Sequence, residues 1–213
     1  MTVALMLLMT YELIGRAAHE WIGVSMFVLF VLHHILNGKW SRNVLKGKYT
    51  ALRLFQTVLV ICVLLCMAGS MISGIILSEH VFAFLSIRSG QSWARTWHLL
   101  CSYWGFVMMS LHLGFHWSMM MAMAKKHFGE SSRLRTWILR AVGAGIAAYG
   151  VHAFGNREIG SYMLRRSEFV FFDFEEPLVF FFLDYIAVMG LFVFIGHYLA
   201  KLLKWLRSKR KMT

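Results

Sequence analysis

Long apolar runs constrain this chain more than any other feature of its sequence. A helix needs about 20 mostly apolar residues to cross the hydrocarbon core of a bilayer. Lipid offers the backbone no hydrogen-bond partner, so such runs are expected to be transmembrane helices. Five runs of suitable length and composition are present: Ala17–Asn37, Leu54–Ser78, Trp93–Ala124, Thr136–Phe154 and Leu178–Leu203.

Composition agrees with an integral-membrane protein. The chain is 59% hydrophobic and 15% charged, whereas a soluble domain is about 45–50% apolar and about 25% charged. The chain contains a single proline, Pro177, and no Gly/Ser-rich linker. We therefore expect one membrane domain over residues 1–213.

The first fourteen residues form another apolar run, Met1–Ile14, which is too short to span a bilayer alone. It lacks the basic start and the small-residue cleavage site of a signal peptide. We interpret it as the greater part of a first transmembrane helix that is clipped at its start. The expected fold is thus all-α, a polytopic transmembrane bundle of about six helices.

Basic residues follow the connections of this expected bundle. Most Lys and Arg residues lie after the second helix, after the fourth helix and in the C-terminal tail. The positive-inside rule then predicts that both termini lie on the cytoplasmic side of the membrane. Insertion topology and anionic membrane lipid account for the net charge of +12, so no nucleic-acid partner is inferred.

Two pairs of histidines share one spacing. His19 and His33 are fourteen residues apart in the second expected helix, and His98 and His112 are fourteen apart in the fourth. Fourteen steps of about 100° leave an offset of roughly 40° and a rise of about 21 Å. Both histidines of a pair therefore share one side of their helix, with one near each membrane surface.

The second and fourth helices run in the same direction, because a single span separates them. His19 should lie level with His98 near the outer surface, and His33 with His112 near the inner one. This geometry predicts two b-type haems, each held by two imidazoles in a four-helix-type di-haem core. The haems would be non-covalent, because the chain has no C-x-x-C-H motif.

An alternative inner pair is available in His34 and His116. Equal spacing favours His33 and His112, which leaves His34 and His116 to contact haem propionates or to lie in the interfacial region. A closed zinc site is the less favoured reading of the four histidines, because such a site takes four ligands at about 2 Å.

Small and basic residues near the outer histidines have two interpretations. Gly23 and Gly105 would make room for a flat macrocycle, or would allow close helix packing. Arg16 and Arg95, each about one turn before an outer histidine, would pair with propionates or contact lipid headgroups. Gly69 with Ser73, in the third expected helix, indicates helix packing alone.

Two polar features in the C-terminal part of the chain each have two possible roles. Asp184, within the last expected helix, is a candidate for a proton path or for an ion pair with an outer arginine. The outer segment "FVFFDFEEP", which ends at Pro177, is interpreted as an interfacial segment, with partner docking as the alternative.

Several of these histidine-containing motifs resemble those of one known protein family. The motifs "HEWIG…HHILNGKW" and "H…LHLGFHW", within Tyr11–Trp117, and the later "DYIAVMGLFVFIGHY" resemble the flavinylation-associated cytochromes of bacteria. The resemblance implies a b-type di-haem membrane cytochrome with His19, His33, His98 and His112 as axial ligands.

Such a cytochrome would take electrons from a quinol or a cytoplasmic reductase. It would pass them across the cytoplasmic membrane to an extracytosolic flavoprotein that carries covalently attached FMN. The chain would then be an electron-transfer component rather than a stand-alone enzyme. Two other functions stay open: a transporter or proton/metal channel that uses intramembrane histidines, and a haem-free membrane scaffold. A broken helix or an internal repeat would favour a transporter, and the sequence suggests neither.

Overall fold

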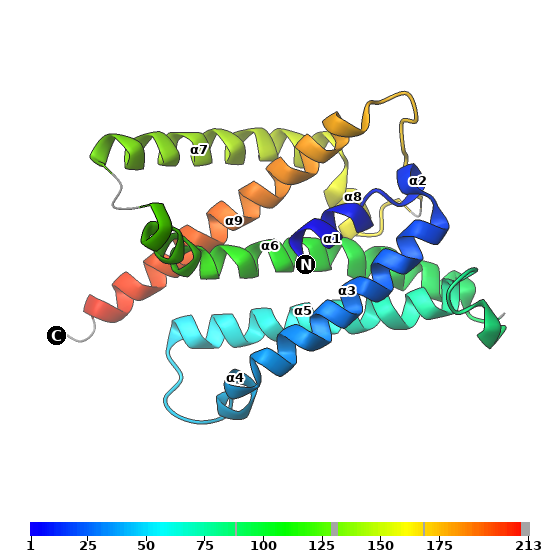
Figure 1. Ribbon diagram of the computed structural model, residues 1–213, viewed down its shortest axis with the longest axis horizontal. Helices are drawn as coiled ribbons and strands as arrows, with labels where there is room; N and C mark the ends of the chain where they lie inside the picture. Colours follow the sequence, from blue (N-terminus) through cyan, green and yellow to red (C-terminus); the bar gives the residue numbers. More distant parts are fainter. Residues whose placement is uncertain (88, 129–131, 168, 210–213) are drawn as a thin grey trace. The chain divides into compact units, whose positions relative to one another are not determined.

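The computed structural model describes residues 1–87, 89–128, 132–167 and 169–209. Most of the described residues lie in helices, as predicted, and turns and irregular segments connect these helices (Figure 1). The elements are α1 Thr2–Leu8, α2 Tyr11–Ile14, α3 Arg16–Leu36, α4 Gly38–Asn43, α5 Ala51–Leu77, the 3-10 helix η1 Ala83–Leu85, α6 Gln91–Phe128, α7 Arg133–Asn156, α8 Ile159–Met163 and α9 Leu178–Lys209.

Four helices in the described part of the chain are long and apolar enough to cross a membrane: α3, α5, α7 and α9. They correspond to four of the predicted spans, so membrane-spanning helices are supported by length and composition. Helix α6 has 38 residues and contains the expected span Trp93–Ala124. It carries His, Ser, Trp and basic residues among its apolar ones, which lowers its mean hydropathy.

Residues 1–14 differ from the expectation of one continuous helix, because they form α1 and α2. The break lies at Thr10, whose hydroxyl donates to the Leu7 carbonyl at 2.6 Å while its backbone N–H bonds the same oxygen at 3.2 Å. A threonine that bonds nearby backbone in this way competes with the regular helical ladder. Gly15, at φ +82°, then separates α2 from α3.

The chain divides into two compact units, which are described separately. Unit 1 comprises Met1–Lys48, Cys62–Phe106 and Ile159–Phe182. Unit 2 comprises Tyr49–Ile61, Val107–Glu158 and Leu183–Thr213. Within unit 1, α1 and α2 pack against α3.

Glycines allow the helices of unit 2 to approach closely. The backbone at Gly150 of α7 lies against the carbonyl of Ala187 in α9, and Gly114 of α6 lies against the carbonyl of Val193. A Cβ atom at either glycine would overlap that carbonyl oxygen. Small residues at helix contacts are typical of membrane proteins, where association depends on close packing rather than on a hydrophobic driving force.

Asp184 of α9 is bound by two donors from α7 and its end. Arg157 Nε donates to Asp184 Oδ2 at 2.7 Å, and the Tyr149 hydroxyl donates to Oδ1 at 2.6 Å. Of the two roles expected of Asp184, the structure therefore shows the ion pair, with Arg157 as the partner. Pairing and hydrogen bonding offset the cost of burying this carboxylate.

We predict that Gly150→Ala lowers the free energy of unfolding of the purified protein. The expected loss is about 1–3 kcal/mol, the usual cost of overpacking. The matched control is Gly145→Ala in the same helix, where a new Cβ would have no atom within 4 Å. Both substitutions replace glycine by alanine within a helix, so both favour the helix by a similar free energy of about 1 kcal/mol. Thermal unfolding in detergent should therefore show a lower melting temperature for Gly150→Ala only, and equal shifts would contradict the close contact.

Candidate functional site

A cavity of about 500 Å³ lies within unit 1. Cofactor pockets usually measure about 300–1,000 Å³ and combine apolar walls with a few placed polar groups. This cavity is lined by residues of α1 to α3, α5 and α6 and by the segment Phe169–Phe172. Five of the residues singled out from the sequence are among them: Arg16, His19, Gly23, Arg95 and His98.

The outer histidines are close together at this cavity. The ring centroids of His19, on α3, and His98, on α6, are 6.0 Å apart, and the ring planes are inclined by 67°. An imidazole nitrogen binds a metal at about 2 Å, so two rings on opposite sides of one ion have centroids about 6 Å apart. The structure thus brings the outer pair together at a spacing that fits axial ligation of one iron.

The His98 ring is held by α5. Its Nδ1 lies 3.1 Å from the carbonyl oxygen of Ser70 and 3.1 Å from the hydroxyl oxygen of Ser73. A carbonyl only accepts, so Nδ1 carries the proton, and Nε2 is left as the nitrogen able to bind a metal. Ser73, interpreted from the sequence as a packing residue, therefore also contacts the candidate ligand.

The His19 ring is held differently. Its Nδ1 is buried and makes no hydrogen bond among the described residues. The Leu8 backbone lies near enough to interact with the ring, but it leaves Nδ1 unsatisfied. The Tyr11 ring packs edge-on against the imidazole, with centroids 5.0 Å apart.

Glu20, next to His19, binds the loop that follows α5. Its carboxylate accepts from the Ser78 hydroxyl at 2.6 Å and from the backbone N–H groups of Glu79, His80 and Val81 at 2.9, 3.1 and 2.7 Å. Sequence reasoning assigned Glu20 no role, although an acidic residue beside a histidine near the end of a span is a usable signal.

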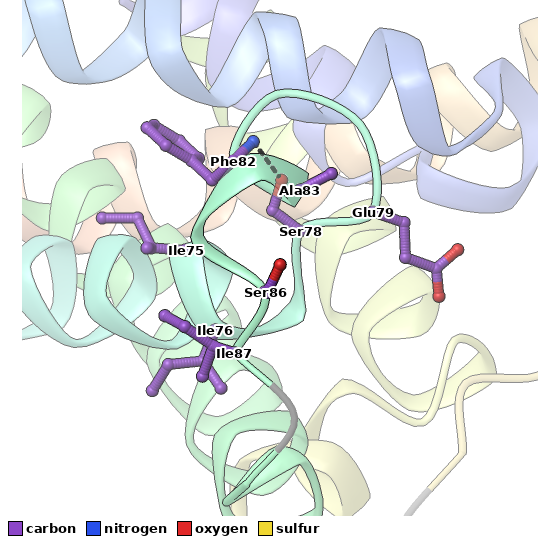
Figure 2. Close-up of a pocket in the computed structure, with 8 residues that line it drawn as sticks. All are labelled: Ile75, Ile76, Ser78, Glu79, Phe82, Ala83, Ser86 and Ile87. Atoms are coloured by element: carbon purple, nitrogen blue, oxygen red, sulfur yellow. Dashed lines mark hydrogen bonds between the residues drawn. The ribbon is translucent and has the colours of Figure 1, made fainter.

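The same loop encloses a smaller pocket of about 240 Å³ (Figure 2). Figure 2 shows Ser78 and Phe82 joined by a hydrogen bond, in which the Phe82 N–H donates to the Ser78 hydroxyl at 2.8 Å. Ser78 therefore links the loop to Glu20 and so to α3. This loop also supplies part of the wall of the larger cavity.

The two arginines lie at the cavity in different surroundings. Arg16 forms an ion pair with Glu79 at 2.8 Å, and both side chains are more than half exposed. Exposed pairs of this kind contribute little stability, about 0–1 kcal/mol. Arg16 thus has a carboxylate partner within the protein, which sequence reasoning did not foresee, while Arg95 lines the cavity from α6.

The predicted glycines separate into two roles. Gly23 lines the cavity, whereas Gly105 packs against the Cβ of Cys66, as the helix-packing alternative predicts. Gly74 of α5, which the sequence did not single out, lies beside the His98 ring, where a Cβ would be 3.4 Å from Cε1.

The inner histidines are divided between the two units. His33 and His34 belong to unit 1, where the His34 Nδ1 donates to the Phe30 carbonyl at 3.0 Å. His112 and His116 belong to unit 2, with ring centroids 4.8 Å apart. A backbone bond of this kind also orients metal-binding histidines, so His34 stays open as an inner ligand. The inner pairing stays a prediction from spacing.

Within the described ranges, no three or more His, Cys, Asp or Glu side chains gather closely enough to hold a metal ion. A scan against protein-family models finds no match for this chain, and searches of curated proteins and of solved structures find none either. The resemblance to the flavinylation-associated cytochromes therefore rests on the sequence motifs.

We predict that Glu20→Ala destabilises the loop after α5. The change leaves several N–H groups without their acceptor, and bonds to a charged acceptor contribute about 1.5–3 kcal/mol each. Limited proteolysis should show faster cleavage within residues 79–90, and the melting temperature should fall. Glu12→Ala, at an exposed residue that also lines the cavity, is the control. The same cleavage rate for both variants would refute the role of Glu20.

Proposed function

We propose that this chain is a b-type membrane cytochrome that relays electrons across the bacterial cytoplasmic membrane. The observation that carries the proposal is the outer pair: His19 and His98 have ring centroids 6.0 Å apart and line one cavity of cofactor size. Two imidazoles contributed by different helices are a standard way to hold haem iron in a helical membrane protein.

The residues of the cavity would act on the haem in distinct ways. His19 and His98 would hold the iron, and Ser70 with Ser73 would orient the His98 imidazole. Gly23 and Gly74 would leave room at the wall, and Arg95 would offer a guanidinium to a propionate. The bound haem would supply reversible one-electron chemistry, at a potential set by ligand identity, burial and hydrogen bonding.

The remaining elements of the proposal rest on spacing and resemblance. His33 with His112, or alternatively His34 with His116, would hold a second haem near the cytoplasmic surface. A quinol or a cytoplasmic reductase would supply electrons, and an extracytosolic FMN-bearing flavoprotein would receive them. Both termini would be cytoplasmic. The paired histidines favour this relay over a transporter or a haem-free scaffold.

We predict that the protein purified from a haem-replete bacterial host is red, with a Soret band that shifts on reduction. The pyridine haemochrome assay should give two non-covalent haems per chain. A colourless protein that stays colourless after addition of haem would leave the transporter and the scaffold as the remaining functions.

We also predict that the double variant His19→Ala/His98→Ala loses one haem of the two. The outer site would have no axial ligand, whereas the inner pair would be unchanged. His127→Ala, at an exposed residue near the end of α6, is the control and should keep two haems. Loss of both haems from the double variant, or of neither, would contradict the assignment of the outer ligands.

A further inference from the structure

The two imidazoles of the outer pair differ in what holds them. Ser73 is buried, with 1% of its surface exposed, and its hydroxyl donates to the Gly69 carbonyl at 2.6 Å. Its lone pairs are therefore available to His98, where Nδ1 is 3.1 Å away. Together with the Ser70 carbonyl, this gives the His98 Nδ1–H two acceptors from one helix.

His19 is held less firmly by the residues that the structure describes, because the Leu8 backbone near its ring does not satisfy Nδ1. Its Nδ1 is buried without a hydrogen bond. Its ring contacts Tyr11 of the short helix α2, and that contact sets no tautomer. Nδ1 of His19 thus has no acceptor that would fix a proton on it, in contrast to His98, where the protonated nitrogen is fixed.

This difference has a consequence for metal binding. A hydrogen bond from the second ring nitrogen to an acceptor fixes the ring orientation and raises the basicity of the ligating nitrogen. His98 therefore has the properties of a strong and oriented ligand. His19 would bind with a ring that is less basic and less restrained, and a buried N–H without an acceptor costs free energy when that nitrogen carries the proton.

We infer that the outer site is asymmetric, with His98 as the ligand that retains the haem and His19 as the ligand that external molecules can replace. This inference rests on the proposed function. Release of His19 would open one coordination position, which a small neutral ligand such as carbon monoxide or free imidazole would occupy. His19 lines the cavity, so displacement of its imidazole would leave the space for this ligand.

The test compares His19→Gly with His98→Gly, each purified and shown to be monodisperse. We expect His19→Gly to keep two haems per chain, with one of them five-coordinate and high-spin. On reduction that haem should bind carbon monoxide, and added imidazole should restore a low-spin spectrum. We expect His98→Gly to keep one haem only. Equal haem loss in the two variants, equal retention, or the reverse order would overturn the asymmetry.

Failure of this inference is distinguishable from failure of the proposed function. Wild-type protein without haem would refute the cytochrome itself. Wild-type protein with two haems, combined with equal behaviour of the two glycine variants, would refute the asymmetry alone.

Ser73→Ala gives a second measurement that does not depend on the folding of His98→Gly. Loss of one acceptor should make the His98 imidazole less basic and so destabilise ferric iron. We expect the midpoint potential of the outer haem to rise in a redox titration, with the haem content unchanged. Ser25→Ala is the control, because Ser25 is exposed and bonds only the Trp21 carbonyl of its own helix. An unchanged or lowered potential in Ser73→Ala would overturn the role given to His98.

Discussion

A polar side chain in apolar surroundings has no water to bond, so it needs hydrogen-bond partners within the protein. In unit 1, these partners connect the helices around the cavity. Glu20 takes its donors from the loop after α5, and His98 takes its acceptors from α5 itself. Helix α5 and the loop that follows it therefore position groups on both α3 and α6. The imidazole of His19 is the exception, since its Nδ1 stays unpaired.

The arrangement of the outer pair could be predicted from the sequence because helix periodicity is a strong constraint. Two apolar runs that carry histidines near matching ends, separated by a single span, must place them at similar depth if the runs are parallel. The spacing of His19 and His98 from their inner counterparts thus identified two histidines that line one cavity. Arg16, Arg95 and Gly23 followed from their sequence distance to these histidines.

The hydrogen bonds that hold the His98 imidazole could not be predicted in the same way. Ser70 and Ser73 lie on a helix without histidine, and a small polar residue in an apolar span equally indicates close packing. Their contact with His98 depends on how α5 and α6 are rotated about their axes, which periodicity alone does not determine. The break at Thr10 was missed for a related reason, because the competition between its side-chain bond and the helix ladder is local and small in energy.

The number of protein donors at the cavity bears on which kind of group it could take. Two carboxylates that line the cavity with His19 are already engaged, Glu20 by the loop and Glu79 by Arg16. A closed zinc site requires four protein ligands, and the described residues offer no such cluster. Two imidazoles with ring centroids 6.0 Å apart would instead suit a metal that brings further ligands of its own, as the iron of a porphyrin does. This count of donors is the reason why haem, rather than a bare metal ion, is the proposed occupant of the site.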